Sequence, residues 1–270
     1  MVRFVEDRIG LGTVISLGVA AGAVALLVRF SRSAAPAPRS PREFPPPPLF
    51  RPPNAPPGGG RFPALVERWR GEVARRSKDL PVPAILEWIR SESGGDMCST
   101  GTPYEVGIFQ LMFPGDAKYG ASLEGLRAIC RKSDQHDPSD ISWLSESELD
   151  MEVGAGIRKI LAARDEVRQS LKNRHVAWPE TSFDFGSAVK QIHAAPAVIT
   201  ELLPKLLRQG GPPASWSELR QRVLTFPVDQ MGEGLRSLAQ APSRHGLKNR
   251  LEDTLNNAEG VGRAWAASYV

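Results

Sequence analysis

The sequence predicts an all-α protein, and three observations favour that fold class. No stretch shows the sustained period-two alternation that is typical of a half-buried strand. Several stretches instead carry apolar residues at the 3.6-residue period of an amphipathic helix. Two segments, 145–148 (SESE) and 215–218 (SWSE), have the Ser-x-x-Glu pattern of a capping box, which marks the start of a helix.

The composition excludes several classes of protein. Of the 270 residues, 41% are hydrophobic and 24% are charged, so the chain is not wholly disordered. Two cysteines are too few for a disulfide-dense mini-protein or a four-cysteine zinc site, and the four histidines have no metal-ligand spacing. The net charge of +4 is concentrated in residues 1–63, which leaves the rest nearly neutral. We therefore expect no metal and no nucleic-acid partner.

Residues 1–30 contain a predicted membrane anchor. Residues 9–28 (IGLGTVISLGVAAGAVALLV) form a run of 20 residues without a charge. As a helix rising about 1.5 Å per residue, this run covers the roughly 30 Å hydrocarbon core of a bilayer. The flanking arginines and the lack of a polar face argue against a buried core helix. A cleaved signal peptide is the competing interpretation, but its apolar region is usually only about 7–15 residues long.

Residues 31–63 are predicted to be a proline-rich spacer, because 12 of the 24 prolines lie between Pro36 and Pro63. Proline lacks the amide hydrogen and fixes φ, so this stretch cannot form helix or sheet ladders. A polyproline conformation, at about 3.1 Å per residue, would carry the following domain well away from the membrane. An unselected disordered linker and a proline-rich ligand for an adaptor domain are the alternatives.

Residues 64–270 are predicted to form one helical domain. After the capping box at 145–148, an apolar stripe predicts a long helix that reaches about residue 171. Gly154 and Gly156 lower the helix propensity of this segment, which indicates close packing against another helix. Further helices are expected at 64–77, 82–92, 122–132, 185–193, 196–208, 215–225 and 247–267.

The helix at 82–92 carries a glutamate on its apolar face. Ile85, Ile89 and Glu92 share one face, at spacings of four and three residues. Burial makes a carboxylate costly to ionise, so we expect the pKa of Glu92 to lie above its usual value. A raised pKa suits a general acid that works near neutral pH. Pairing with an arginine, or a frayed helix end that turns the side chain outward, is the structural alternative.

The residues from Glu92 onward resemble a known superfamily. Residues 92–95 (ESGG) end the helix, 104–112 read YEVGIFQLM, and 114–120 read PGDAKYG. In order and spacing, these segments resemble the lytic transglycosylase (SLT) and goose-type lysozyme superfamily over about residues 80–165. The segment 149–156 (LDMEVGAG) is similar to the helix that packs behind the cleft in that family. The resemblance implies a lysozyme-like domain that cleaves the glycan strands of bacterial peptidoglycan without a cofactor.

The resemblance also implies a role for individual residues. Glu92 would protonate the glycosidic oxygen and then, as a base, activate the incoming hydroxyl, while the acetamido group of the substrate assists at the sugar carbon. Attack by the 6-hydroxyl of muramic acid would give the 1,6-anhydro product of a lytic transglycosylase, and attack by water would make the protein a lysozyme. Gln110 would line the sugar groove, and the backbone around Ile108 would hold the acetamido group.

Three further site residues are expected near Glu92. Ser93 would cap or hydrogen-bond near the catalytic group, without acting as a nucleophile. Glu105 either shapes the cleft or lies on the surface of a loop. Many relatives have a Tyr-Asn pair on a late helix, with the Tyr bonded to the catalytic Glu, and this chain lacks that pair. His193, or the Asn-Asn pair at 256–257, is the candidate for its place.

Cys98 and Cys130 are candidates for a disulfide. Cys98 follows the helix that carries Glu92, and Cys130 lies on the apolar side of the helix expected at 122–132. A bridge would pin the active-site loop to that helix, would add about 3–4 kcal/mol of stability, and would suit an oxidising periplasm. Two buried thiols are the alternative.

The expected substrate determines the expected location. Peptidoglycan lies outside the cytoplasmic membrane, so the body should be periplasmic or extracellular, held to the bacterial inner membrane through residues 9–28. The arginines that follow this run oppose that orientation under the positive-inside rule, and we give the substrate argument more weight. The alternative function is a non-catalytic module that binds glycan within an envelope or secretion complex. The missing Tyr-Asn pair favours this alternative, whereas Glu92 and Gln110 oppose it.

Overall fold

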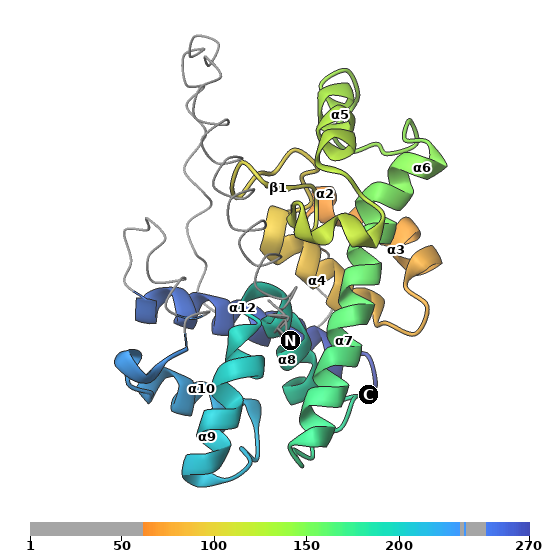
Figure 1. The fold of residues 1–270 in the computed structure, drawn as a ribbon. Helices are drawn as coiled ribbons and strands as arrows, with labels where there is room; N and C mark the ends of the chain where they lie inside the picture. Colours follow the sequence, from red (N-terminus) through yellow and green to blue (C-terminus); the bar gives the residue numbers. More distant parts are fainter. Residues whose placement is uncertain (1–61, 233–234, 236–246) are drawn as a thin grey trace, which may run out of the picture. The chain divides into compact units, whose positions relative to one another are not determined.

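The computed structural model describes residues 62–232, residue 235 and residues 247–270 (Figure 1). The predicted anchor and nearly all of the predicted spacer lie outside this part of the chain. The described part is mostly helical, at 64%, in agreement with the predicted helical body. Within these ranges, no helix has both the length and the apolar character needed to cross a membrane.

The helix expected at 64–77 is divided into two, α2 (Ala64–Glu67) and α3 (Arg70–Arg76). The break falls at Arg68 and Trp69. Both side chains donate a hydrogen bond to the carbonyl oxygen of Gly95, at 2.9 Å from Arg68 Nη2 and 2.9 Å from Trp69 Nε1. The break therefore lies where this N-terminal segment is attached to the turn that follows the next helix.

Helix α4 (Val82–Ser93) agrees closely with the helix expected at 82–92. Pro83 occupies its first turn, where a missing amide hydrogen costs nothing. Gly94 ends it in the left-handed conformation, with φ of 65°. The predicted apolar face is buried, and it comprises Ala84, Ile85, Leu86, Trp88 and Ile89.

A two-stranded hairpin follows α4 and was not predicted from the sequence. Strands β1 (Glu105–Val106) and β2 (Leu111–Met112) pair antiparallel, with Glu105 opposite Met112. Two residues per strand are too few to produce an alternating pattern, which explains why the sequence did not indicate them. The turn between the strands uses positive φ angles at Gly107 (87°) and Gln110 (49°). A short 3-10 helix, η1 (Gly115–Tyr119), comes next.

The long helix predicted after residue 145 is present, with one irregular turn. Helix α6 (Glu146–Leu149) begins with the predicted capping box, and a π-helical turn, η2 (Asp150–Gly154), connects it to α7 (Ala155–Asn173). Close packing is present at Gly156, but the neighbour is the hairpin turn and not the expected helix, because a Cβ atom there would lie 2.0 Å from the ring of Phe109. Before α6, the chain forms α5 (Leu123–Ser133), whose first turn is capped by Ser122.

The C-terminal half consists of helices close to the expected positions. They are α8 (Phe183–Ala194), η3 (Val198–Leu202), α9 (Leu203–Gly210), α10 (Trp216–Thr225), η4 (Val228–Gln230) and α12 (Leu247–Ala266).

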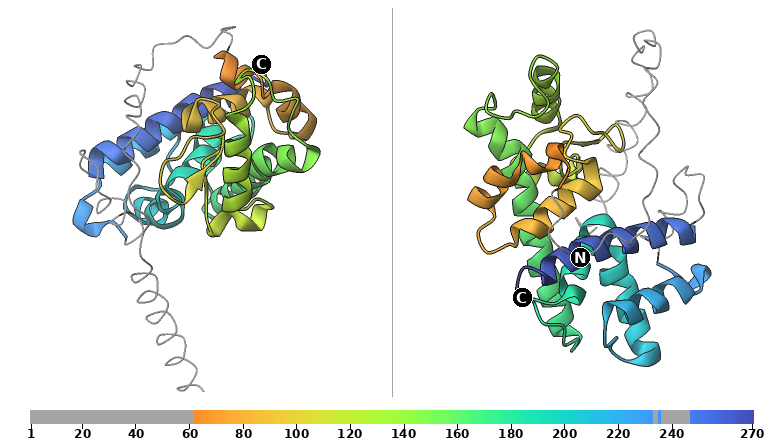
Figure 2. Two further views of the ribbon diagram at one scale, coloured as in Figure 1. Left: turned by 90° about the horizontal axis from the view of Figure 1, so that it is seen from above. Right: turned by 180° about the vertical axis from the view of Figure 1, so that it is seen from behind.

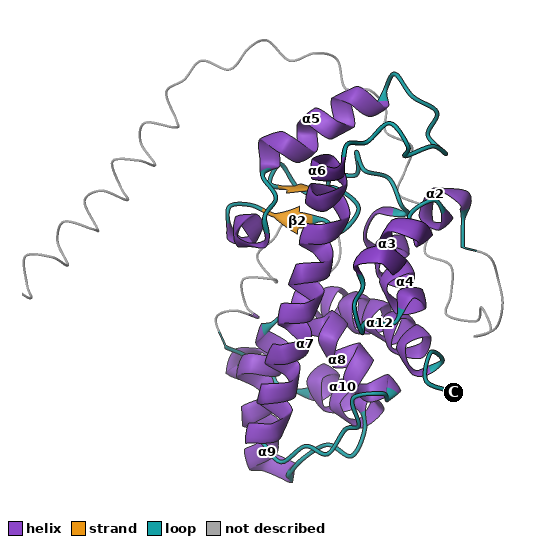
Figure 3. Ribbon diagram, turned by 90° about the vertical axis from the view of Figure 1, so that its right-hand side faces the viewer, coloured by secondary structure: helices purple, strands orange, loops and turns teal. Residues whose placement is uncertain are grey.

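Packing of α12 brings distant segments of the chain together. Helix α12 packs against both α8 and α4, and it lies next to α4 in the right-hand view of Figure 2. Helix α7 packs against α8 and leads from the end that holds α5 and α6 to the end that holds α9 (Figure 3). The C-terminal end of α4, the hairpin and the inner faces of α7, α8 and α12 thereby meet around one cleft.

Candidate active site

This cleft has a volume of about 230 Å³. Its lining includes four residues that the sequence analysis singled out, together with one member of the Asn-Asn pair. The lining residues are Glu92, Glu105, Gln110, Met112, Lys159, Lys190, His193, Ala194, Thr254 and Asn257. Folding thus brings together residues that lie up to 165 positions apart in the sequence.

Glu92 lies in the last turn of α4, and 20% of its side chain is exposed. Its Oε1 accepts a hydrogen bond from Nζ of Lys190, a residue on α8 whose side chain is only 1% exposed. The Lys190 ammonium also lies 4.6 Å from the centre of the Trp88 ring. The second neighbour of Glu92 is His193, whose Nε2 is 3.4 Å from the same Oε1.

These neighbours reverse the expected pKa shift of Glu92. Burial acting alone would raise this pKa, but the positive charge of Lys190 and the hydrogen bonds from His193 and Lys190 outweigh it. The pKa of Glu92 is therefore held well below its usual value, and the carboxyl group is ionised at neutral pH. The prediction of a raised pKa was wrong because the partner is a lysine 98 residues further along the chain.

His193 is neutral at neutral pH. Burial lowers its pKa to about 4, although the hydrogen bond to Glu92 and the negative charge of Glu92 act in the opposite direction. Its ring meets Trp88 edge to face, with 5.1 Å between the ring centres. A neutral imidazole that is protonated on Nε2 can donate to the Glu92 carboxylate.

Ser93 and Ile108 connect the end of α4 to the hairpin turn. Ser93 Oγ lies 2.9 Å from the carbonyl oxygen of Ile108, to which it donates, and it accepts from the Gly95 amide at 3.1 Å. Ser93 thus caps the helix end as expected. The Ile108 side chain is fully buried, and its amide donates inward to Glu152 Oε2 at 3.3 Å. Neither Ser93 nor Ile108 is among the residues that line the cleft, so the structure does not bring these two predicted site residues to its surface.

Gln110 and Glu105 lie on the hairpin side of the cleft. Gln110 Nε2 donates to the carbonyl oxygens of Ser99 (2.8 Å) and Gly107 (2.9 Å), so this side chain holds the loop as well as lining the cleft. Glu105 is half-buried and lines the cleft. A Cβ atom at Gly101 would lie 2.5 Å from the Glu105 carboxylate, so glycine lets the preceding loop close over this side chain.

Glu152 is a second buried carboxyl group, and the sequence analysis did not single it out. Only 1% of its surface is exposed, and Oε1 has no hydrogen-bond partner among the described residues. Burial raises the pKa of Glu152 to about 8, in spite of the hydrogen bond from Ile108 and the positive charge of Arg68. The signal in the sequence was an acid within the apolar stripe, three residues after Leu149 and four before Gly156.

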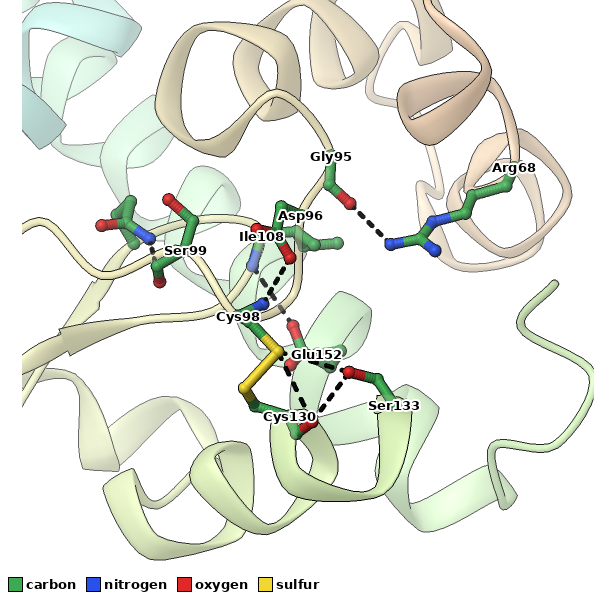
Figure 4. The surroundings of a disulfide bond; sticks show 10 residues. Arg68, Gly95, Asp96, Cys98, Ser99, Ile108, Cys130, Ser133 and Glu152 are labelled. Atoms are coloured by element: carbon green, nitrogen blue, oxygen red, sulfur yellow. Dashed lines mark hydrogen bonds between the residues drawn. A yellow bond between two sulfur atoms is a disulfide. The ribbon is translucent and has the colours of Figure 1, made fainter. Parts of the chain in front are cut away.

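A disulfide between Cys98 and Cys130 lies beside this network (Figure 4). The two Cα atoms are 4.9 Å apart, and the bridge joins the loop after α4 to helix α5. Ser99, the residue after Cys98, supplies one of the two carbonyl oxygens to which Gln110 donates. The disulfide therefore restrains one wall of the cleft.

Replacing both cysteines with serine is expected to lower the free energy of unfolding by about 3–4 kcal/mol, because the bridge restricts the unfolded chain. Urea unfolding, followed by tryptophan fluorescence, measures this difference. The wild-type protein, once exported and then unfolded without reductant, should show no thiol that reacts with a maleimide. The single variant Cys98→Ser is the control, with one reactive thiol. Two reactive thiols in the wild type would rule out the bridge.

Two lysines of the cleft were not anticipated from the sequence. Lys190 lies on α8 among buried, uncharged residues such as Val189, Gln191 and Ile192, and a lysine in such a stretch was the available signal. Lys159 Nζ is 2.5 Å from Asp116 Oδ2, which in turn accepts from the Met112 amide at 2.7 Å. Lys159 thereby fixes η1 beneath the hairpin.

Comparison with known proteins shows no relative: no protein-family model, curated protein or solved structure matches the chain. Among residues 62–232, 235 and 247–270, no three His, Cys, Asp or Glu side chains are grouped so as to hold a metal ion. The assignment of a function therefore depends on the residues of the cleft and their geometry.

Proposed function

We propose that the protein is a membrane-anchored lytic transglycosylase that cleaves the glycan strands of peptidoglycan. The observation that carries this proposal is the lining of a single cleft by Glu92, Glu105, Gln110 and His193. The resemblance in sequence assigned Glu92 and Gln110 to a glycan-cleaving site, and it left open whether Glu105 and His193 belong there. Within this cleft, the Glu92 carboxylate accepts a hydrogen bond from the Lys190 ammonium and lies 3.4 Å from Nε2 of His193.

The ionised state of Glu92 suits the general-base step of the proposed reaction. An ionised carboxylate can accept the proton of the attacking hydroxyl, which is the work of a general base. The neutral His193 would keep Oε1 oriented toward the cleft through its Nε2 hydrogen. The other half of the chemistry, protonation of the glycosidic oxygen, requires a proton that Glu92 does not hold at rest.

The location of the body is part of the proposal. Peptidoglycan is assembled outside the cytoplasmic membrane, so we place the body in the periplasm, attached through residues 9–28 and separated by the proline-rich segment. A disulfide beside the cleft supports an oxidising compartment, because cytosolic thiols are normally kept reduced. Glycan strands would be its main partner, alongside proteins of an envelope complex.

Digestion of purified peptidoglycan by the full chain tests the proposal, with the products identified by mass spectrometry. We expect 1,6-anhydro ends, which are lighter by one water than reducing ends, because the resemblance to lytic transglycosylases implies attack by the 6-hydroxyl of the substrate. Reducing ends would instead identify a lysozyme. Glu124→Gln changes an exposed glutamate on α5 and is the matched control.

A non-catalytic glycan-binding module is the second candidate, and one observation favours it. Glu92 is ion-paired with Lys190, and this resting state does not protonate a glycosidic oxygen. The same digestion separates the two candidates: glycan that is retained by the protein but yields neither kind of product identifies a binding module.

A further inference from the structure

Lys190 places an ammonium group in the wall of the cleft although only 1% of its side chain is exposed. Burying an ammonium group is costly, and an apolar side chain of similar volume would fill the same space without that cost. The other buried residues of α8 are uncharged, including the polar Ser187 and Gln191, so packing of α8 does not call for a charge here. The position of Lys190 is thus better explained by its contact with Glu92 than by stability.

The contacts of Lys190 are directed at the reacting group. Its Nζ donates to Glu92 Oε1, and the face of the Trp88 ring stabilises the ammonium from the other side at 4.6 Å. The pair shares one proton, which lies on Lys190 at rest. Moving that proton to Glu92 would convert two buried charges into a neutral carboxylic acid and a neutral amine, a change that burial favours.

The other charged and titratable groups around the pair are less suited to supply this proton. On α8, His193 is neutral and its ring is a very weak acid. On α7, Lys159 is bound to Asp116. On α4, Glu87 is bound to Arg90, Glu105 lines the cleft from β1, and α12 contributes only the uncharged Thr254 and Asn257 to the cleft.

We propose that Lys190 is a positioning residue that stores the proton that Glu92 delivers to the glycosidic oxygen. This inference rests on the proposed function. Binding of a glycan strand would exclude water from the cleft and transfer the proton from Lys190 Nζ to Glu92 Oε1. The lowered pKa of Lys190, which results from burial in spite of the charge of Glu92, makes that transfer easier.

The proton returns to the pair at the end of the cycle. Glu92 protonates the glycosidic oxygen as the bond from that oxygen to C1 breaks, and the bonding electrons remain on the leaving oxygen. The acetamido oxygen of the substrate forms a bond to C1 at the same time. The incoming hydroxyl then displaces the acetamido oxygen from C1, and its proton passes to Glu92 and back to Lys190. One proton leaves the pair and one is regained.

Two substitutions in the full chain separate proton storage from a purely electrostatic role. Lys190→Met removes both the charge and the proton, and Lys190→Arg keeps the charge but holds its proton at every accessible pH. At about pH 8, we expect both variants to cleave peptidoglycan about 10²–10⁴-fold more slowly than the wild type. Lys172→Met, at an exposed position in the last turn of α7, is the matched control.

The pH profile supplies a readout that a merely structural role would not move. Without Lys190, burial raises the pKa of Glu92, so Lys190→Met should work only below that pKa, where Glu92 carries its own proton. The cleavage activity of Lys190→Met should therefore decline with rising pH at a lower pH than that of the wild type. Lys190→Arg should show no recovery at any pH. Activity is normalised to folded protein by circular dichroism and by retention on chitooligosaccharide.

A measurement on the wild type covers the case in which the variants do not fold. Addition of chitooligosaccharide should add an infrared C=O band of a protonated carboxylic acid to that of Glu152, and this ligand-induced increase should be absent from Glu92→Gln. Three results would each overturn proton storage while leaving the proposed function standing. Lys190→Arg could cleave at the wild-type rate, the alkaline side of the pH–activity profile could be unchanged in Lys190→Met, or the ligand-induced infrared band could be absent. A wild type that binds glycan but never cleaves it would overturn the proposed function itself.

Discussion

Glu92→Gln is expected to reduce peptidoglycan cleavage by about 10²–10⁴-fold, the loss that is typical when a general acid–base group is removed. Glutamine keeps the shape of the side chain and can still accept the hydrogen bond from Lys190, but it cannot carry the transferable proton. Release of soluble muropeptides from purified peptidoglycan measures the rate. Glu105→Gln should cost less, because Glu105 is expected only to shape the cleft that it lines, whereas Glu92 carries the transferable proton.

The same substitution is also expected to lower the free energy of unfolding. Replacing an isolated buried carboxyl group with Gln would be expected to raise the free energy of unfolding. Glu92, however, neutralises Lys190, and loss of the carboxylate leaves the Lys190 ammonium buried without a counter-charge. Activity must therefore be compared at equal amounts of folded protein. Full activity in folded Glu92→Gln would show that this position does not carry the catalysis.

Glu152→Gln is expected to flatten the dependence of stability on pH. The pKa of Glu152 is about 8 in the folded protein and near 4.5 in the unfolded chain, so the folded state binds the proton more tightly. Stability is unaffected by this group below about pH 4.5 and falls as the pH rises toward 8, because only the unfolded chain ionises freely in that window. At 1.36 kcal/mol per pKa unit, the wild type should lose on the order of 4 kcal/mol across the window.

Urea unfolding of both proteins at about pH 5 and about pH 8 measures this difference. All six tryptophans lie between Trp69 and Trp265, so their fluorescence reports on the described body. Glutamine can still accept the Ile108 hydrogen bond. Any effect of the substitution on the free energy of unfolding that does not depend on pH cancels when the values at the two pH values are subtracted. The exposed Glu124→Gln is the control. Equal pH slopes for the wild type and Glu152→Gln would mean that Glu152 is not protonated in the folded state.

Most of the helices could be predicted from the sequence, because the patterns that predict a helix involve residues close together in the chain. The pattern from Val82 to Ser93 contains an early proline, an apolar face and a terminal glycine, and the helix has those bounds to within one residue. The Ser-x-x-Glu box at 145–148 forms a capping box, since all of its partners lie within one turn. Gly156 predicted a close contact but not its partner, because the sequence does not show which ring would approach.

The site was predictable as a set of residues but not as an electrostatic environment. Glu92, Glu105, Gln110 and His193 were singled out from the sequence, and all four line the cleft. The ionisation of Glu92 was predicted in the wrong direction, because the pKa depends on a lysine from another helix. A lysine on a predominantly apolar helix gives no sign in the sequence of which carboxylate it will meet.

The sequence by itself determined the approximate positions of most helices of the body, which residues could take part in acid–base chemistry, and which two cysteines were available to pair. The tertiary structure alone decided the hairpin, the partner of Glu92 and the burial of Glu152. Helix caps and apolar periodicity involve residues only a few positions apart, so the local sequence is enough to predict them. Hydrogen bonding and desolvation at Glu92 and Glu152 depend on segments from 44 to 98 residues away, which only the packing of α4, α7 and α8 brings into contact.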